Sequence, residues 1–202
     1  LVEVRSSGLF SPKALGKAGD QTANQFLCHA LREARPDDGL LSEEEKDNAA
    51  RIDKERVWIV DPVDGTREYG EARADWAVHV GMAVNGAPTI GAVALPGLDL
   101  TGTGGGTVLR SDQPRPLPHA PEKLRMVVSR TRPAAEAVAV ADALDAELVP
   151  MGSAGAKAMA ESAAPTPQPS TTTTTTTIPP RGNADLVIWA DETRATVLKP
   201  SL

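Results

Sequence analysis

The sequence predicts an α+β fold, in which helices are layered against sheets, and three local patterns support this class. Residues 20–35 repeat apolar side chains at intervals of three and four, which is the period of an amphipathic helix. Residues 57–60 read Val-Trp-Ile-Val, a run of strand-forming side chains. Asn85-Gly86 lies between two further apolar runs and is a strong signal for a β-hairpin.

The chain has 202 residues, enough for one large or two small domains, and a formal net charge of −6. This acidic balance argues against binding to a nucleic acid polymer, because such binding requires a basic surface. It does not argue against a small phosphorylated substrate, because bound metal ions invert the local electrostatic field.

Cys28 is the only cysteine, so an intramolecular disulfide is impossible, and a reducing, cytoplasmic location fits best. No apolar run reaches the length of a membrane span and no signal peptide is visible, so we expect no membrane partner. Neither composition nor patterning indicates an oligomeric state.

Helical features dominate the first part of the chain. Residues 1–5 read as the end of a helix that starts earlier in a longer chain, and residues 6–19 read as a loop. Asp20 is then the expected N-cap of a helix that Pro36 ends. From spacing alone, capping is a sufficient role for Asp20.

The stretch that organises the chain is the end of the strand at residues 57–60. It runs directly into Asp61-Pro62-Val63-Asp64-Gly65-Thr66. The proline stiffens the backbone between the two carboxylates, and the glycine lets a ligand approach the backbone closely. Two fixed carboxylates, the free carbonyl of Val63 and a hydroxyl are oxygen donors of the kind that Mg²⁺ prefers.

An acidic pair upstream, Glu43-Glu44, strengthens the prediction of a metal site. Carboxylates that converge on one spot repel one another, so the cluster is costly unless protons or cations neutralise it. The alternative is an Asx-type turn that closes the strand and leaves its acids solvated, but such a turn has no need of the upstream pair.

Two strands are expected next, at residues 76–84 and 89–95, joined by the hairpin turn. His79 lies in the middle of the first of them, and we interpret it as a core or face residue rather than a ligand or base. Residues 102–106 read Gly-Thr-Gly-Gly-Gly and lead into a strand-like run, so they favour a hairpin tip over a phosphate cradle, which needs a following helix.

The second half begins at residues 112–121, where four prolines indicate a linker. A strand at 124–129, a helix at 133–147 and a short strand at 148–149 follow. Gly152-Ser-Ala-Gly-Ala-Lys157 then opens another helix. Its small residues expose backbone N–H groups that suit an anion, or equally allow close helix packing. Residues 161–181 are rich in Pro, Ser and Thr, and we expect them not to fold.

These motifs resemble a known family. Ser42-Glu-Glu44 followed by Trp58-Ile-Val-Asp-Pro-Val-Asp-Gly-Thr-Arg-Glu-Tyr69 is similar to the first signature of the lithium-sensitive, Mg²⁺-dependent phosphatases of the inositol monophosphatase superfamily. Asp75-Trp-Ala-Val78 and the segment at 152–157 resemble its bacterial 3′-phosphoadenosine 5′-phosphate phosphatase (CysQ-type) branch. The resemblance covers residues 1–160. It implies a layered αβαβα fold like that of the sugar phosphatases, here without its first helix and with an irregular C-terminal part.

The resemblance also implies roles for single residues. An Asp at the position of Asp20 pairs with the motif threonine, here Thr66, and the two orient a metal-bound water. The implied Mg²⁺ ligands are Glu43, Asp61, the Val63 carbonyl, Asp64 and Asp191. Asp191 is matched through Trp189-Ala-Asp191, and the alternative match is Glu161. The implied substrate contacts are Asp64, Gly65, Thr66, Gly152, Ser153, Ala154 and Lys157, the last of these to a nucleotide phosphate.

By this resemblance the chain is an Mg²⁺-dependent hydrolase that removes the 3′-phosphate of 3′-phosphoadenosine 5′-phosphate to give AMP. The alternatives are an inositol or fructose phosphate phosphatase, or a catalytically impaired fragment. The expected organisation is a metal-binding α+β domain at 1–110, a Pro-rich linker at 111–122, a partial substrate-binding α/β domain at 123–160, a low-complexity segment at 161–181 and a degenerate remnant of the second domain at 182–202.

Overall fold

A computed structural model describes residues 1–100, 105–114, 122–162, 187–190 and 195–198. The chain divides into two compact units. One unit comprises Leu1–Pro118 with Met151–Ala164, and the other comprises His119–Pro150 with Pro165–Leu202. The predicted metal motif and the predicted helix opening at residue 152 therefore belong to the same unit.

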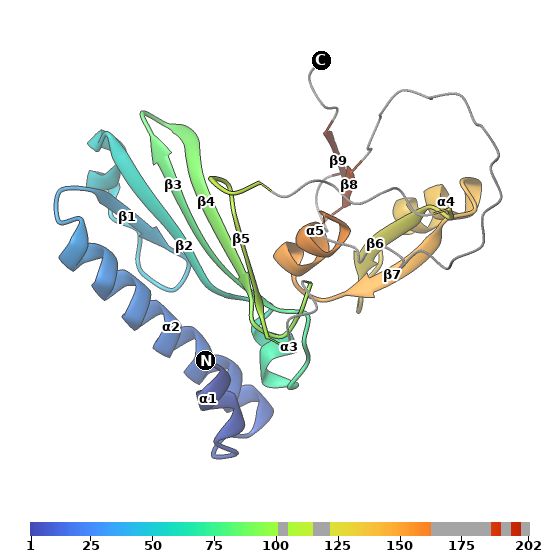
Figure 1. The fold of residues 1–202 in the computed structure, drawn as a ribbon, viewed down its shortest axis with the longest axis horizontal. Helices are drawn as coiled ribbons and strands as arrows, with labels where there is room; N and C mark the ends of the chain where they lie inside the picture. The colour runs from blue at the N-terminus through green and yellow to red at the C-terminus, as the bar shows by residue number, and fades with distance from the viewer. Residues whose placement is uncertain (101–104, 115–121, 163–186, 191–194, 199–202) are drawn as a thin grey trace, which may run out of the picture. The chain divides into compact units, whose positions relative to one another are not determined.

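The first unit is built on a five-stranded sheet with the strand order β1-β2-β3-β4-β5 (Figure 1). The strands are β1 Gly39–Ser42, β2 Arg56–Asp64, β3 Ala77–Val84, β4 Ala87–Leu95 and β5 Thr107–Arg110. β1 pairs with β2 in parallel, and the other three pairings are antiparallel. At the β3–β4 turn, Asn85 and Gly86 have positive φ values of 50° and 78°, which confirms the predicted hairpin.

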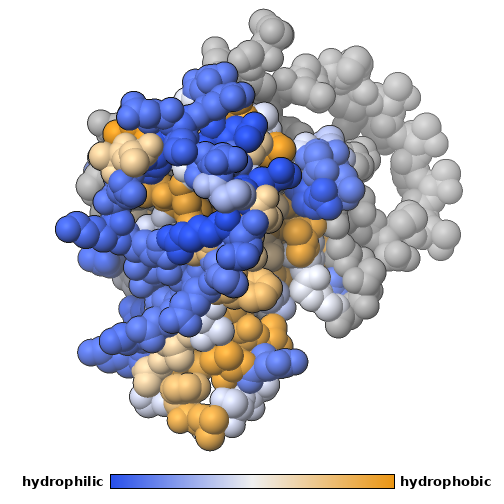
Figure 2. Space-filling view, turned by 90° about the vertical axis from the view of Figure 1, so that its left-hand side faces the viewer, coloured by the Kyte–Doolittle hydropathy of each residue, from blue (hydrophilic) through white to orange (hydrophobic). Residues whose placement is uncertain are grey.

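Helices lie on both sides of this sheet (Figure 1). They are α1 Val2–Ser6, α2 Pro12–Ala34, α3 Thr66–Gly70 and α5 Ala154–Ser162, with a short 3₁₀ helix, η1, at Ala49–Asp53. One core joins α2 to the sheet and to α3 through Leu15, Ala23, Val63, Tyr69 and Trp76. A second core packs Ala156 of α5 on Ala77 and Leu95. Hydrophilic side chains cover most of the α2 side of the unit (Figure 2).

The expected start of the second helix was wrong. α2 begins at Pro12, so residues 12–19 are helical, and Asp20 lies inside the helix instead of capping it. Proline fits the first helical turn because its missing N–H has no partner there. Gly19 weakens an isolated helix, but a Cβ at this position would lie 2.5 Å from Cε1 of Tyr69. Tertiary packing therefore outweighs the loop-like composition.

β2 changes its pairing where the metal motif begins. Its register with β3 shifts between Asp61 and Asp64, as in a β-bulge. Gly65 follows with φ of 88°, a left-handed conformation that favours glycine, and α3 starts at Thr66. The bulge and the sharp turn place the acids at the end of the strand, in front of a helix.

The second unit contains β6 Arg125–Ser129, α4 Ala135–Ala143 and β7 Glu147–Met151 up to Pro150, and β6 and β7 form a two-stranded sheet. Its core consists of Met126, Val128, Ala137 and Ala141. The predicted helix at 133–147 is shorter in the structure, because Asp145 takes a positive φ of 49°. β8 Val187–Ala190 and β9 Ala195–Leu198 pair antiparallel.

The segment predicted not to fold was 161–181. Glu161 and Ser162 end α5, so the prediction was wrong for these two residues, and residues 163–181 lie outside the described residues, so it stays a prediction there. The domain boundaries also stay predictions. In the described part of the chain, no helix combines the length and the apolar character that crossing a membrane requires.

Candidate metal and substrate site

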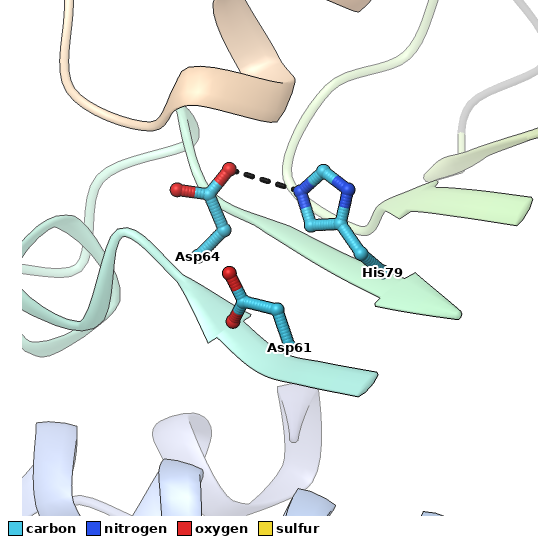
Figure 3. Close-up of side chains that lie close together, drawn as sticks. All are labelled: Asp61, Asp64 and His79. Atoms are coloured by element: carbon cyan, nitrogen blue, oxygen red, sulfur yellow. Dashed lines mark hydrogen bonds and ion pairs between the residues drawn. The ribbon is translucent and has the colours of Figure 1, made fainter. Parts of the chain in front are cut away.

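Two carboxylates and an imidazole meet at the end of β2. Asp61 lies directly opposite His79 in the β2–β3 register, and Asp64 follows after the bulge. Figure 3 shows both carboxylates and the ring turned toward a common region. One ligand atom from each of these residues lies within 4.8 Å of the other two. The structure therefore brings together the two acids of the predicted motif and adds a histidine to them.

Asp64 is held by four hydrogen bonds. Its Oδ2 lies 2.9 Å from His79 Nε2 and accepts from Ser153 Oγ at 2.7 Å and from the Gly155 N–H at 2.5 Å. Its Oδ1 accepts from the Ala154 N–H at 3.2 Å. Burial alone would raise the pKa of Asp64, but the His79, Gly155 and Ser153 bonds outweigh burial and lower it. Asp64 is therefore a fixed, ionised carboxylate at the N-terminus of α5.

Asp61 has the opposite electrostatic environment. Burial, followed by the charges of Glu43 and Asp64, raises the pKa of Asp61 to about 7. Its Oδ1 is buried and has no hydrogen-bond partner among the described residues. A buried carboxylate oxygen without a donor is costly, and a divalent cation would satisfy it. The residues at this site therefore fit a hard cation.

Glu43 lies at the edge of this cluster. It follows β1, its N–H donates to the Val60 carbonyl at 3.2 Å, and its side chain is exposed. It lies outside the group of ligand atoms that fall within 4.8 Å of one another. Its charge nevertheless helps to raise the pKa of Asp61. The structure thus brings Glu43 into electrostatic range of the metal motif, and its role as a ligand stays a prediction.

The predicted pair of Asp20 and Thr66 lies beside the cluster. The Thr66 hydroxyl is 3.2 Å from Asp20 Oδ1 and 3.1 Å from the Val63 carbonyl oxygen. Burial, then the charge of Glu44, raises the pKa of Asp20 to about 6. The hydroxyl that was predicted to orient water thus has two acceptors in range for its one proton, and one of them is the backbone oxygen that was predicted to bind metal.

The small residues that open α5 are explained by two close approaches. A Cβ at Gly152 would lie 2.1 Å from Cδ of Glu68, and a Cβ at Gly155 would lie 2.2 Å from Cε1 of His79. Both distances are far below van der Waals contact, so close packing, one of the two interpretations from sequence, accounts for the glycines. The Asp64 carboxylate at the same N–H groups also illustrates the other interpretation, a preference for negative charge.

Two residues of the site were not among the sequence predictions. His79 was interpreted as a core or face residue, yet it is half-buried and hydrogen-bonded to Asp64. Asp75 accepts from the Gly152 N–H at 2.7 Å and from Arg73 Nε at 2.8 Å, so it fixes the segment before α5. His79 could have been found only from the pairing of β2 with β3, which places it opposite Asp61. Lys157 lies on α5, and Asp191 lies outside the described residues.

Comparisons with known proteins agree with these motifs. A sequence profile of the inositol monophosphatase family matches residues 8–160. The 3′-phosphoadenosine 5′-phosphate phosphatase of Mycobacterium bovis is 44% identical over 166 residues, which cover 79% of this chain and 61% of that protein. The protein of the same name from Mycobacterium leprae is 44% identical over 173 residues, with 79% and 62% covered. The chain thus spans less than two thirds of the length of these relatives.

A more distant relative is the 3′(2′),5′-bisphosphate nucleotidase CysQ of Escherichia coli K12. It is 34% identical over 80 residues, which cover 39% of this chain and 32% of that protein. The shorter match still lies within the CysQ-type branch to which the motifs pointed.

Solved structures show a shared fold. Inositol monophosphatase II from Staphylococcus aureus aligns with a TM-score of 0.56 at 22% identity, over 79% of this chain and 64% of that one. An IMPase/NADP phosphatase solved with Mg²⁺ and phosphate aligns with a TM-score of 0.51 at 21% identity, over 72% and 57%. Together with the mixed sheet and its helices, these likenesses confirm the predicted α+β class.

Proposed function

This chain belongs to the inositol monophosphatase family, and we propose that it catalyses the Mg²⁺-dependent hydrolysis of a phosphate monoester. The observation that carries the proposal is the pair of carboxylates at the end of β2, in which Asp61 keeps a buried oxygen without a donor beside the ionised Asp64. The two acidic side chains repel each other when both are ionised, and a divalent cation between them would neutralise this repulsion.

The proposed Mg²⁺ ligands are Asp61, Asp64, the Val63 carbonyl and Glu43, with Asp191 as a further candidate. Bound Mg²⁺ neutralises phosphoryl charge and makes a coordinated water more acidic. Asp61 has a free oxygen for this purpose. Asp64 has a carboxylate that four hydrogen bonds hold in place, so little entropy is lost when it binds.

Asp20 and Thr66 are proposed to orient the attacking water. The Thr66 hydroxyl has one proton and two acceptors within 3.2 Å, the Asp20 carboxylate and the Val63 carbonyl. When the proton is directed to Asp20, the hydroxyl oxygen keeps a lone pair for a water proton. Hydrolysis then joins the water oxygen to phosphorus, breaks the ester P–O bond, and leaves the released alcohol with a proton.

The proposed substrate is 3′-phosphoadenosine 5′-phosphate, with AMP and inorganic phosphate as products. The support is the 44% identity to mycobacterial proteins that bear the name of this activity. The proposed contacts are Asp64, Gly65, Thr66, the segment Gly152-Ser153-Ala154, and Lys157 for a second phosphate. In the structure the donors of the segment 152–154 bond to Asp64 and Asp75. A cytoplasmic location, which the lone buried Cys28 suits, is proposed with them.

A substrate panel tests the proposal. Phosphate release is measured with 3′-phosphoadenosine 5′-phosphate, inositol 1-phosphate and fructose 1,6-bisphosphate at equal concentration and saturating Mg²⁺. We expect kcat/KM to be highest for the nucleotide bisphosphate. A higher value for inositol or fructose phosphate would assign the site to another substrate of the family, and release from none of them would overturn the proposed function for this chain.

A further inference from the structure

The ring of His79 is the part of the cluster that the Mg²⁺ proposal does not use. His79 projects from β3 opposite Asp61, and its Nε2 lies 2.9 Å from Asp64 Oδ2. Adjacent ligands of an ion at about 2.1 Å are about 3.0 Å apart when the ion is six-coordinate and about 3.4 Å apart when it is tetrahedral, as Zn²⁺ usually is. The 2.9 Å between Nε2 and Oδ2 is close to the spacing of adjacent ligands, and one ligand atom from each of the three residues lies within 4.8 Å of the other two, so small side-chain shifts would bring all three to one cation.

The ring is held in place by its surroundings. The side chain of His79 is 30% exposed, and the ring lies so close to the first turn of α5 that a Cβ on Gly155 would be 2.2 Å from its Cε1. Asp64 is held from the other side by Ser153 and by N–H groups of α5. Nitrogen and oxygen donors are thus positioned before any ion arrives, which reduces the entropy lost on binding.

The donor set also bears on which ion is preferred. Carboxylates, carbonyls and water suit Mg²⁺, whereas imidazole suits Zn²⁺ and other first-row transition metals, which bind a given nitrogen and oxygen site more tightly as the series rises. A site with two carboxylate oxygens alone would favour a hard cation. The same site with an added imidazole gains affinity for Zn²⁺ without a matching gain for Mg²⁺.

We propose that Asp61, Asp64 and His79 form a mixed nitrogen–oxygen site that binds Zn²⁺ more tightly than Mg²⁺, with His79 Nε2 as a direct ligand. Before an ion binds, Nε2 donates its proton to the ionised Asp64, so ligation requires the ring to carry its proton on Nδ1, and bonds from Nε2 and Asp64 to the ion replace the hydrogen bond between them. The two ions share both carboxylates, so Zn²⁺ competes with Mg²⁺ for the proposed phosphatase site. The inference rests on the metal site of the proposed function, but it needs no phosphorylated substrate.

Isothermal titration calorimetry of the full chain with Zn²⁺ alone and with Mg²⁺ alone tests this assignment. His79→Gln removes the imidazole and keeps a side-chain N–H for Asp64. We expect this variant to lose at least tenfold in Zn²⁺ affinity, since even residues that only support a ligand cost 10- to 100-fold, and to keep its Mg²⁺ affinity. His29→Gln, which removes an exposed histidine of α2, is the matched control and should leave both affinities unchanged.

Three results would overturn the assignment. Zn²⁺ binding no tighter than Mg²⁺ binding in the unmodified chain would remove the preference. An unchanged Zn²⁺ affinity in His79→Gln would remove the ligand. An equal loss for both ions would mean that His79 only supports Asp64 through its hydrogen bond.

Phosphate release with Mg²⁺ separates this inference from the proposed function. Release that persists while Zn²⁺ binds weakly would contradict only the zinc site. Tight Zn²⁺ binding that depends on His79, without any phosphate release, would support the zinc site and contradict only the phosphatase.

Discussion

The hydroxyl of Thr66 lies 3.2 Å from Oδ1 of Asp20, so the first residue of α3 is joined to the middle of α2 across 46 positions of sequence. Gly16 allows this approach, because a Cβ there would lie 3.0 Å from Cγ2 of Thr66. Burial is the main reason why the pKa of Asp20 is raised to about 6. The contact joins this carboxyl to the threonine whose hydroxyl also lies 3.1 Å from the Val63 carbonyl oxygen.

Replacing the hydroxyl tests the role of this pair. Thr66→Ala should lower kcat about 10²-fold, as for other groups that position a proton transfer, and should leave the Mg²⁺ affinity nearly unchanged. Thr66→Ser keeps the hydroxyl and is the control, with kcat close to that of the unmodified chain. Steady-state phosphate release and Mg²⁺ titration are measured for all three proteins. Unchanged kcat with weakened Mg²⁺ binding would reverse the roles.

The raised pKa of Asp61 predicts a stability that depends on pH in the metal-free protein. The pKa of Asp61 is about 7 in the folded protein, against an ordinary value of 3.8 for an aspartic acid, chiefly because of burial. The unfolded chain therefore releases this proton at a lower pH than the folded protein does. Between about pH 4 and about pH 7 the folded protein binds more protons, so its stability falls as the pH rises through this range. Asp61→Asn removes that loss and should raise the melting temperature at pH 8 in the presence of a chelator.

With Mg²⁺ present, the unmodified chain should have a higher melting temperature than Asp61→Asn, the reverse of the order expected without metal. The unmodified chain should gain stability with Mg²⁺ by mass action, whereas Asp61→Asn should gain little. Asp37→Asn alters an exposed acid and serves as the control. An Asp61→Asn variant that is less stable than the unmodified chain without metal would argue that the carboxylate is not electrostatically strained.

The contact between Gly155 and His79 predicts a local packing defect. In Gly155→Ala the new methyl group meets the imidazole, so the ring must leave Asp64 or α5 must shift. Overpacking of this kind costs about 1–3 kcal/mol. Gly91→Ala is the matched control, because a Cβ there has no neighbour within 4 Å. Urea unfolding should separate the two variants, and equal stabilities would contradict the close packing of the ring.

Two Arg–Asp pairs with the same spacing allow a matched comparison at low pH. In the Arg73–Asp75 pair the aspartate side chain is buried, with 8% of it exposed. In the Arg110–Asp112 pair the aspartate side chain is 50% exposed. Burial raises the pKa of Asp75, but the bonds from Arg73 and the Gly152 N–H outweigh it and lower the pKa. The stabilisation by Asp75 is therefore present above about pH 4 and is lost as the pH falls further.

Asp75→Asn should accordingly cost about 1–3 kcal/mol at pH 7 and have a smaller effect near pH 3, because a charge-assisted hydrogen bond is lost only where the carboxyl is ionised. Asp112→Asn should change stability little at either pH, as is usual for exposed ion pairs. Thermal unfolding across this pH range distinguishes the two. A similar cost for both variants would show that burial of Asp75 adds nothing.

The sequence was sufficient to predict the local elements whose signals are short. The strand before Asp61, the hairpin at Asn85-Gly86 and the helix after Ser153 all follow from patterns of a few residues. The motif acids at 61 and 64 were likewise expected to lie close together, and they do, whereas their role as metal ligands stays a prediction.

Features that depend on packing between distant segments were not predicted. Residues 12–19 look like a loop because they contain Gly and Lys, yet they form a helix whose glycines face Thr66 and Tyr69. His79 looks like an ordinary strand residue until the β2–β3 register places it opposite Asp61. Both outcomes depend on which segments pair, and the local sequence does not encode that directly.

The most direct measurement is phosphate release from 3′-phosphoadenosine 5′-phosphate by the unmodified chain and by Asp64→Asn, each with saturating Mg²⁺ and with a chelator. We expect Mg²⁺-dependent release by the unmodified chain and none by the variant, since no described neighbour replaces a carboxylate fixed at the end of β2 and the start of α5. Release that persists in Asp64→Asn, or that is the same with and without Mg²⁺, would contradict this expectation.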